Sequence, residues 1–208
     1  GRMLAFSAQG PDGIQVLYVR AVDSLMAHPL AGTAGAGMPF WSPDSRSLGF
    51  FADGRLKRIE AAGGPALTLC EVGVVGRGGT WNRDGVIVFA PAPNGPLHKV
   101  QDDGGSSTPV TKVDTARGET SHRWPQFLPD GKHFLFFSRL GALGTSNEKN
   151  GIHIGSLDGD PPKFLLRTQV NAAYASGNLL FLRGTTLMAQ PFDLDRLGLV
   201  GEAVPLAE

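Results

Sequence analysis

The sequence of 208 residues predicts an all-β fold, a β-propeller built from four-stranded antiparallel blades. Three observations carry this prediction. Related segments recur at a regular spacing along the chain, and such a repeat decides the fold class before any other signal. Glycine and proline, with 29 and 15 residues, are scattered between short apolar runs, which is typical of frequent turns. No window places apolar residues at helical spacing without an intervening glycine or proline, so no long helix is expected.

The repeated unit is an aromatic residue, then a polar turn, then a strand with alternating apolar residues. Four segments show it: PFWSPDSRSLGFF at 39–51, GTWNRDGVIVF at 79–89, PQFLPDGKHFLFF at 125–137 and AAYASGNLLFL at 172–182. The aromatic residues that precede the turns are Trp41, Trp81, Phe127 and Tyr174. The opening residues GRMLAF match the end of one more copy, so the sequence contains five related units.

In each of these strands, two apolar residues stand two positions apart, and the second of them is phenylalanine. These residues are Phe6, Phe50, Phe89, Phe136 and Phe181, separated by 44, 39, 47 and 45 positions. A period near 40 to 45 residues is expected for a four-stranded propeller blade. Alternation places both members of a pair on one face of the sheet, where we expect them to pack between blades. Burial of each phenylalanine should then contribute roughly 1.5 to 3 kcal/mol.

The remainder of each unit supplies a second apolar run and a short closing strand, such as LKRIEAAGG at 56–64 followed by ALTL at 66–69. The approximate repeats are 1–33, 34–72, 73–114, 115–168 and 169–208 within a single propeller domain. We therefore expect four complete blades and one blade that lacks its first strand, as part of a longer propeller. Its unpaired strand edges favour self-association with another chain.

Composition excludes several classes of function. The 19 basic residues balance the 19 acidic ones, so no field attracts nucleic acid or an anionic membrane surface. No apolar run is long enough to cross a bilayer, and direct membrane contact is not expected. The single Cys70 cannot form an internal disulfide, and no cysteine or histidine spacing suits zinc. The five histidines fall in different repeats, so no metal or cofactor is expected; His133 and His153 alternate with apolar residues, which suggests solvent-facing positions.

The motifs resemble a known family of repeats. FWSPDS at 40–45 and FLPDG at 127–131, with the weaker WNRDG at 81–85 and YASG at 174–177, resemble the WD40-like, TolB-like propeller repeats known as PD40. The segment HRWPQFLPDGKHFLFFS at 122–138 resembles the C-terminal propellers of bacterial serine/threonine protein kinases. That resemblance implies a sensor or binding role on the extracytoplasmic side of a membrane-anchored parent. The kinase motifs themselves are absent, so the chain is expected to have no kinase activity.

Ser42, which lies beside Pro43 and Asp44, is the residue that most invites a catalytic interpretation. A serine nucleophile on an elbow would need a GxSxG motif, which the sequence lacks. Serine followed by proline is instead the usual composition of a type I turn. We therefore expect Ser42 to form a turn and predict no catalytic residues.

The blade-to-blade connections carry the candidate binding residues. Two irregular segments, 114–124 and 139–150, are long for loops without structure of their own, which is typical of functional loops. The residues expected to line this face or the channel mouth are Arg77, Arg117, Glu119, His122, Arg123 and Arg139. The alternative is that they are solvated loop residues.

The sequence thus favours a noncatalytic module that binds a protein or small-molecule ligand, and the resemblance places it in the sensor region of a bacterial kinase. Two alternatives remain open. One is the gating propeller of a prolyl-oligopeptidase-like serine peptidase, and the other is a TolB-like periplasmic partner-binding protein.

Overall fold

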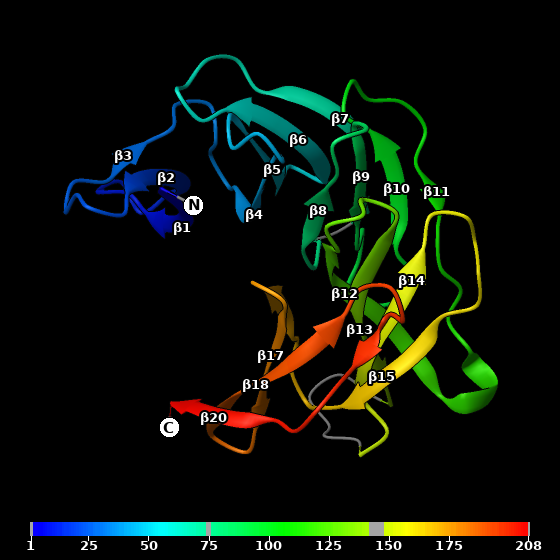
Figure 1. Ribbon diagram of the computed structural model, residues 1–208. Coiled ribbons are helices and arrows are strands. Elements are labelled where there is room, and N and C mark those ends of the chain that lie inside the picture. Colours follow the sequence, from blue (N-terminus) through cyan, green and yellow to red (C-terminus); the bar gives the residue numbers. More distant parts are fainter. Residues whose placement is uncertain (1, 74–75, 142–147, 208) are drawn as a thin grey trace. The chain divides into compact units, whose positions relative to one another are not determined.

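The computed structural model describes residues 2–73, 76–141 and 148–207, and these form five antiparallel sheets (Figure 1). In the first four sheets, consecutive strands along the chain pair with one another, which is the topology of a propeller blade; in the fifth sheet β19 and β20 both pair with β18. The described residues divide into two compact units. Unit 1 comprises residues 1–93 and 98–109, and unit 2 comprises residues 94–97 and 110–208.

Unit 1 contains the first three sheets. The first sheet consists of β1 (Met3–Gln9), β2 (Gln15–Ala21) and β3 (His28–Pro29). The second consists of β4 (Gly37–Trp41), β5 (Ser47–Ala52), β6 (Arg55–Glu60) and β7 (Leu67–Glu71). The third consists of β8 (Gly79–Trp81), β9 (Val86–Phe89), β10 (His98–Gln101) and β11 (Thr108–Pro109).

Unit 2 contains the last two sheets. The fourth consists of β12 (Glu119–Phe127), β13 (His133–Leu140), β14 (Gly151–Ser156) and β15 (Lys163–Arg167). A short 3₁₀ helix, η1 (Thr115–Arg117), precedes it. The fifth consists of β16 (Ala173–Ala175), β17 (Asn178–Arg183), β18 (Thr186–Asp193), β19 (Gly198–Leu199) and β20 (Val204–Ala207).

The predicted fold class is confirmed, because the chain is built from five antiparallel sheets of propeller type. The first sheet has three strands in the described part of the chain, as expected for a blade without its first strand. Two details were not predicted. The fifth sheet gains β19, which extends the hairpin at the end of β18, and η1 adds one helical turn before β12.

Three of the repeated phenylalanines join cores that neighbouring sheets share within a unit, namely Phe50, Phe89 and Phe181. Phe50 and Leu48 point from β5 into a core shared with the first sheet, where Leu17 and Val19 lie. On the opposite face of β5, Phe51 joins a core shared with the third sheet. A third core joins the fourth and fifth sheets of unit 2. The alternation read from the sequence therefore places these side chains between sheets.

Phe6 differs from its counterparts, because 38% of it is exposed whereas Phe50 and Phe89 are fully buried. In the second, third and fifth sheets, the repeated phenylalanine joins the core shared with the preceding sheet. Among the described residues no sheet precedes the first one, so Phe6 only stacks on Tyr18, with ring centroids 5.7 Å apart. The expectation that Phe6 is a buried core residue is therefore wrong.

A left-handed residue lies three positions before the repeated aromatic in three of the sheets. These residues are Met38, Gly78 and Trp124, with φ of 52°, 88° and 51°. In the second and fourth sheets this position falls within a register shift between the first two strands. A β-bulge of this kind bends the strand and changes which face the next side chains occupy. The bulge therefore divides the first strand of the blade into two differently facing halves.

Candidate functional site

The Ser-Pro-Asp segment forms the turn between β4 and β5. The backbone N–H of Ser45 donates to the Ser42 carbonyl at 2.9 Å and closes the turn. The Ser42 hydroxyl donates to Asp44 Oδ1 at 2.6 Å and accepts from the backbone N–H of Ser47 at 2.9 Å. This hydrogen bond from Ser42 lowers the pKa of Asp44. The polar atoms of Ser42 thus serve the turn, in agreement with the sequence interpretation.

The equivalent turn of the third sheet keeps the same bonding with a different residue. Asn82 Oδ1 accepts from the backbone N–H groups of Asp84 and Val86 at 3.1 and 2.8 Å. Asparagine and serine side chains both imitate a backbone acceptor in this way. The turn geometry, and not serine chemistry, is therefore what the repeat preserves.

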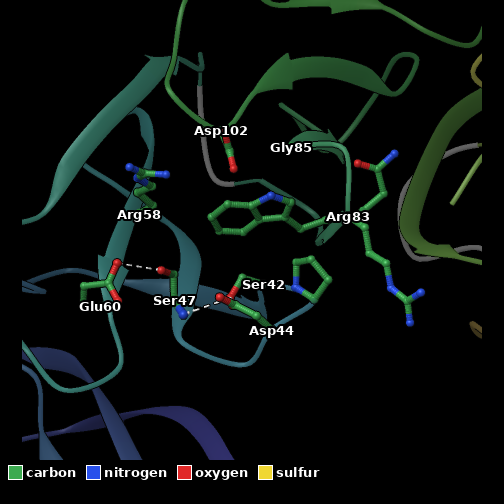
Figure 2. Close-up of a pocket in the computed structure, with 11 residues that line it drawn as sticks. Ser42, Asp44, Ser47, Arg58, Glu60, Arg83, Gly85 and Asp102 are labelled. Atoms are coloured by element: carbon green, nitrogen blue, oxygen red, sulfur yellow. Dashed lines mark hydrogen bonds between the residues drawn. The ribbon is translucent and has the colours of Figure 1, made fainter.

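A pocket of about 580 Å³ opens beside these two turns in unit 1 (Figure 2). Volumes of roughly 300 to 1,000 Å³ are typical of sites for small molecules. Its walls come from the β4–β5 and β8–β9 turns, from β6 and from the end of β10. The lining residues are Ser42, Pro43, Asp44, Ser47, Arg58, Glu60, Trp81, Asn82, Arg83, Gly85 and Asp102.

Opposite charges face this pocket without pairing. Figure 2 shows the ends of Arg58 and Asp102 directed toward the space that the lining residues enclose. Both side chains are half-buried, and within the described ranges neither forms an ion pair or side-chain hydrogen bond. Glu60 is partly engaged, because the Ser47 hydroxyl donates to its Oε1 at 2.9 Å. Trp81 adds an aromatic wall that also belongs to the core between the second and third sheets.

In unit 2, Glu119 is the centre of a hydrogen-bonded cluster. Its carboxylate accepts from the Asp114 backbone N–H at 2.7 Å and from the Ser138 hydroxyl at 3.0 Å, and it lies 3.2 Å from His122 Nε2. Burial alone would raise the pKa of Glu119, but the hydrogen bonds from His122, Asp114 and Ser138 outweigh it and lower the pKa to about 2. His122 Nδ1 in turn lies 2.8 Å from the Thr111 hydroxyl. The Glu119 charge is thus satisfied within the protein.

A second pocket, of about 540 Å³, lies beside this cluster at the end of the fourth sheet where β12 begins. It is lined by Ala116, Arg117, Glu119, Leu140, Lys149, His153, Phe164 and Arg167. Most of its charged groups already have partners in the chain. Arg117 pairs with Asp114 at 3.3 Å, and Arg167 donates to the Glu148 carbonyl at 3.4 Å. The pocket of unit 1 therefore offers more unused binding capacity.

His153 differs from the sequence prediction, which gave it a solvent-facing position. Its ring stacks on Phe136 at 5.5 Å and meets Phe164 edge-on at 5.4 Å, so it is partly buried among aromatic side chains and not a freely solvated strand residue. Its Nδ1 is buried and has no hydrogen-bond partner in the part of the chain that the structure describes. Burial lowers the pKa of this imidazole.

Of the six predicted binding residues, two line a common pocket. Arg77 lies in unit 1, and the other five lie in unit 2. Only Arg117 and Glu119 line the second pocket. His122, Arg123 and Arg139 are buried in β12 and β13, so they are not solvated loop residues. The sequence interpretation missed Arg58 and Asp102, which lie in the second runs of their repeats, at 56–64 and 97–105. Their shared pocket is formed by packing between repeats, for which the sequence carries no local signal.

The described part of the chain contains neither a metal-binding cluster nor a membrane-spanning helix. It contains no cluster of three or more histidine, cysteine or acidic residues suited to a metal ion. No helix among residues 2–73, 76–141 and 148–207 has the length and apolar character needed to cross a membrane.

Comparisons with known proteins place the chain by fold. It matches no family profile and no curated protein sequence. A putative TolB from Agrobacterium tumefaciens is similar in structure, with a TM-score of 0.64 and 15% identity over 97% of this chain and 80% of that chain. A prolyl endopeptidase has a TM-score of 0.59 and 16% identity over 100% of this chain but 34% of that one. The β-propeller domain of the Trilobed protease from Pyrococcus furiosus has a TM-score of 0.54 and 14% identity over 100% and 81%.

At these identities the likeness shows the fold alone. It supports the TolB-like part of the resemblance read from the sequence, and it gives no support to the kinase part.

Proposed function

We propose that this chain is a noncatalytic propeller module that binds a peptide segment in the pocket of unit 1. The observation that carries the proposal is the pair of half-buried, opposite charges, Arg58 and Asp102, which face one pocket without pairing. Half-buried charges gain most from a partner when that partner also excludes water. A peptide supplies both kinds of partner, because its carbonyl or carboxylate oxygens accept from arginine and its N–H or ammonium groups donate to aspartate.

The other lining residues fit the same kind of ligand. Trp81 offers an apolar wall for a side chain, and aromatic residues of this type commonly anchor peptides and proteins. The Ser42 hydroxyl is bonded within its turn, and the lining residues include no histidine or cysteine, which is the reason for proposing binding without catalysis.

A fluorescence titration tests this proposal. A degenerate tripeptide library would be screened by the change in tryptophan emission, with Trp81→Phe used to assign the signal to the pocket. We expect Arg58→Met and Asp102→Asn each to weaken binding of the best tripeptide by roughly 10- to 150-fold, because each removes a charge-assisted hydrogen bond of about 1.5 to 3 kcal/mol. Arg55→Met is the matched control, since Arg55 lies at the other end of β6 and pairs with Glu71. Equal binding by the wild type, Arg58→Met, Asp102→Asn and Arg55→Met would refute the proposal.

The parent protein is a separate question, for which three proposals stand. The resemblance of 122–138 to kinase propellers supports the sensor region of a membrane-anchored bacterial kinase, with the propeller outside the cytoplasm. The likeness in fold to a prolyl endopeptidase and to the Trilobed protease supports a propeller that gates a hydrolase domain. The likeness in fold to a putative TolB supports a TolB-like periplasmic partner-binding protein. The complete reading frame decides among them, because the first requires a kinase domain upstream, the second a GxSxG hydrolase domain, and the third a signal peptide and a separate N-terminal domain.

A further inference from the structure

Arg139 carries a charge that its surroundings leave largely uncompensated. It lies near the end of β13 opposite Ser121 of β12, and it is only 6% exposed. Its Nη2 donates to Asn94 Oδ1 at 2.8 Å. Its Nε and Nη1 are buried and have no hydrogen-bond partner among the residues that the structure describes. One N–H on Nε and two on Nη1 therefore have no acceptor.

This arrangement is unfavourable for a guanidinium. Burial lowers the pKa of Arg139, yet an arginine side chain keeps its proton in proteins. An uncompensated buried charge is among the most costly features that a fold can contain. The Asn94 amide oxygen accepts one hydrogen bond but is neutral, so it supplies no negative charge to compensate the guanidinium. The site is therefore better matched to an oxyanion than to the amide that occupies it.

A second guanidinium reaches the same face of the sheet. Arg123 lies two residues beyond Ser121 on β12, so the two side chains share a face with Arg139. The Arg123 Nε donates to Ser121 Oγ at 2.9 Å, and its guanidinium carbon lies 5.5 Å from the centre of the Trp124 ring. The nearby carboxylate of Glu119 is held on the opposite face, where Ser138 and His122 contact it.

The Asn94 side chain can move although the backbone beside it is fixed. Its side chain is exposed, whereas the adjacent backbone is fixed, because Gly95 N–H donates to the Thr120 carbonyl at 2.9 Å and the Gly95 carbonyl accepts from His122 N–H at 2.9 Å. The Asn94 side chain is thus the part of this contact that can change rotamer while the backbone hydrogen bonds of Gly95 stay in place.

We propose that Arg139, with Arg123 beside it, forms a binding site for a small oxyanion, a carboxylate or a phosphate, which replaces the Asn94 amide on the Arg139 guanidinium. The site lies in unit 2 and is independent of the peptide pocket proposed in unit 1.

The test uses an internal anion. In Asn94→Asp, a carboxylate stands where the amide oxygen now accepts from Arg139. Thermal unfolding would be measured with inorganic phosphate or succinate at low millimolar concentration, with ionic strength held constant by NaCl. For the wild-type chain we expect a saturable rise in Tm of roughly 3 to 6 °C at ten times the dissociation constant. Asn94→Asp should raise Tm by about 2 to 4 °C in NaCl alone and abolish the response to the added anion.

Two further variants complete the design. Arg139→Met removes the buried charge, so it should fold and show no saturable response. Asn171→Asp, an exposed change of the same charge in unit 2, should keep the wild-type response. A response to phosphate alone identifies a phosphate site, and a response to succinate alone identifies a carboxylate site. The proposal is overturned if the wild-type chain responds to neither, or if Asn94→Asp or Arg139→Met responds as the wild type does.

Discussion

The replacement of Phe50 by alanine measures how much the repeat contributes to stability. Phe50 is fully buried in the core that Leu17, Val19 and Ile59 share with it. Removal of a buried phenylalanine side chain loses its transfer free energy and leaves a cavity, at a cost of about 3 to 5 kcal/mol. We expect Phe50→Ala to lower the free energy of unfolding by that amount in urea denaturation followed by tryptophan fluorescence.

Phe6 provides a control from the same position of the repeat. It is 38% exposed and contributes a partial burial and one stacked contact with Tyr18. Phe6→Ala should therefore cost only about 1 to 2 kcal/mol. A loss below about 1 kcal/mol for Phe50→Ala, or equal losses for the two variants, would show that the repeated phenylalanine is not the contact that joins neighbouring sheets.

Three further predictions concern the turn, the sheet packing and the acidic cluster. Ser42→Ala should lower the free energy of unfolding in urea by about 1 to 3 kcal/mol, because the buried Ser47 N–H loses its acceptor. Ser42→Asn should keep that acceptor, so equal losses for the two variants would contradict the turn role. Gly49→Ala would place a Cβ 2.2 Å from the Phe40 ring and should lower the free energy of unfolding by roughly 1 to 3 kcal/mol. Adding Phe40→Leu to this variant should restore part of the loss, and no recovery would point to a different clash. The pKa of Glu119 is lowered to about 2 from 4.5, so its ionised form stabilises the fold above pH 4.5, and this contribution is lost as pH falls toward 2. In Glu119→Gln, the midpoint of urea unfolding should depend less on pH across that range. The same pH dependence in the variant and the wild type would refute the assignment.

The fold was accessible from the sequence because its signals are local and repeated. The spacing of Phe50, Phe89, Phe136 and Phe181 indicated the blades, and the apolar residue two positions before each of them indicated which side chains share a face of the sheet. Phe6 shows the limit of this reasoning. The sequence motif is the same, but its burial depends on a neighbouring sheet that the motif does not contain.

The candidate sites were less accessible, because they depend on contacts between segments distant in sequence. Arg58 and Asp102 face one pocket only after the second and third sheets pack side by side within unit 1. The burial of Arg139 follows from its register opposite Ser121 and from the approach of Asn94, 45 residues earlier. The burial of His153 follows from aromatic neighbours on adjacent strands. Composition alone assigns all four side chains to solvent.

The bulge at Trp124 has a consequence for how such a blade diversifies. Before it, the first half of β12 carries the polar residues Glu119, His122 and Arg123; after it, Gln126 and Phe127 face the neighbouring strands in a shifted register. Substitutions in the first half change hydrogen bonding and charge, while the aromatic half keeps its packing. A single strand of nine residues therefore contains one segment whose side chains form hydrogen bonds and carry charge and one segment that pairs in a shifted register, separated by a left-handed residue.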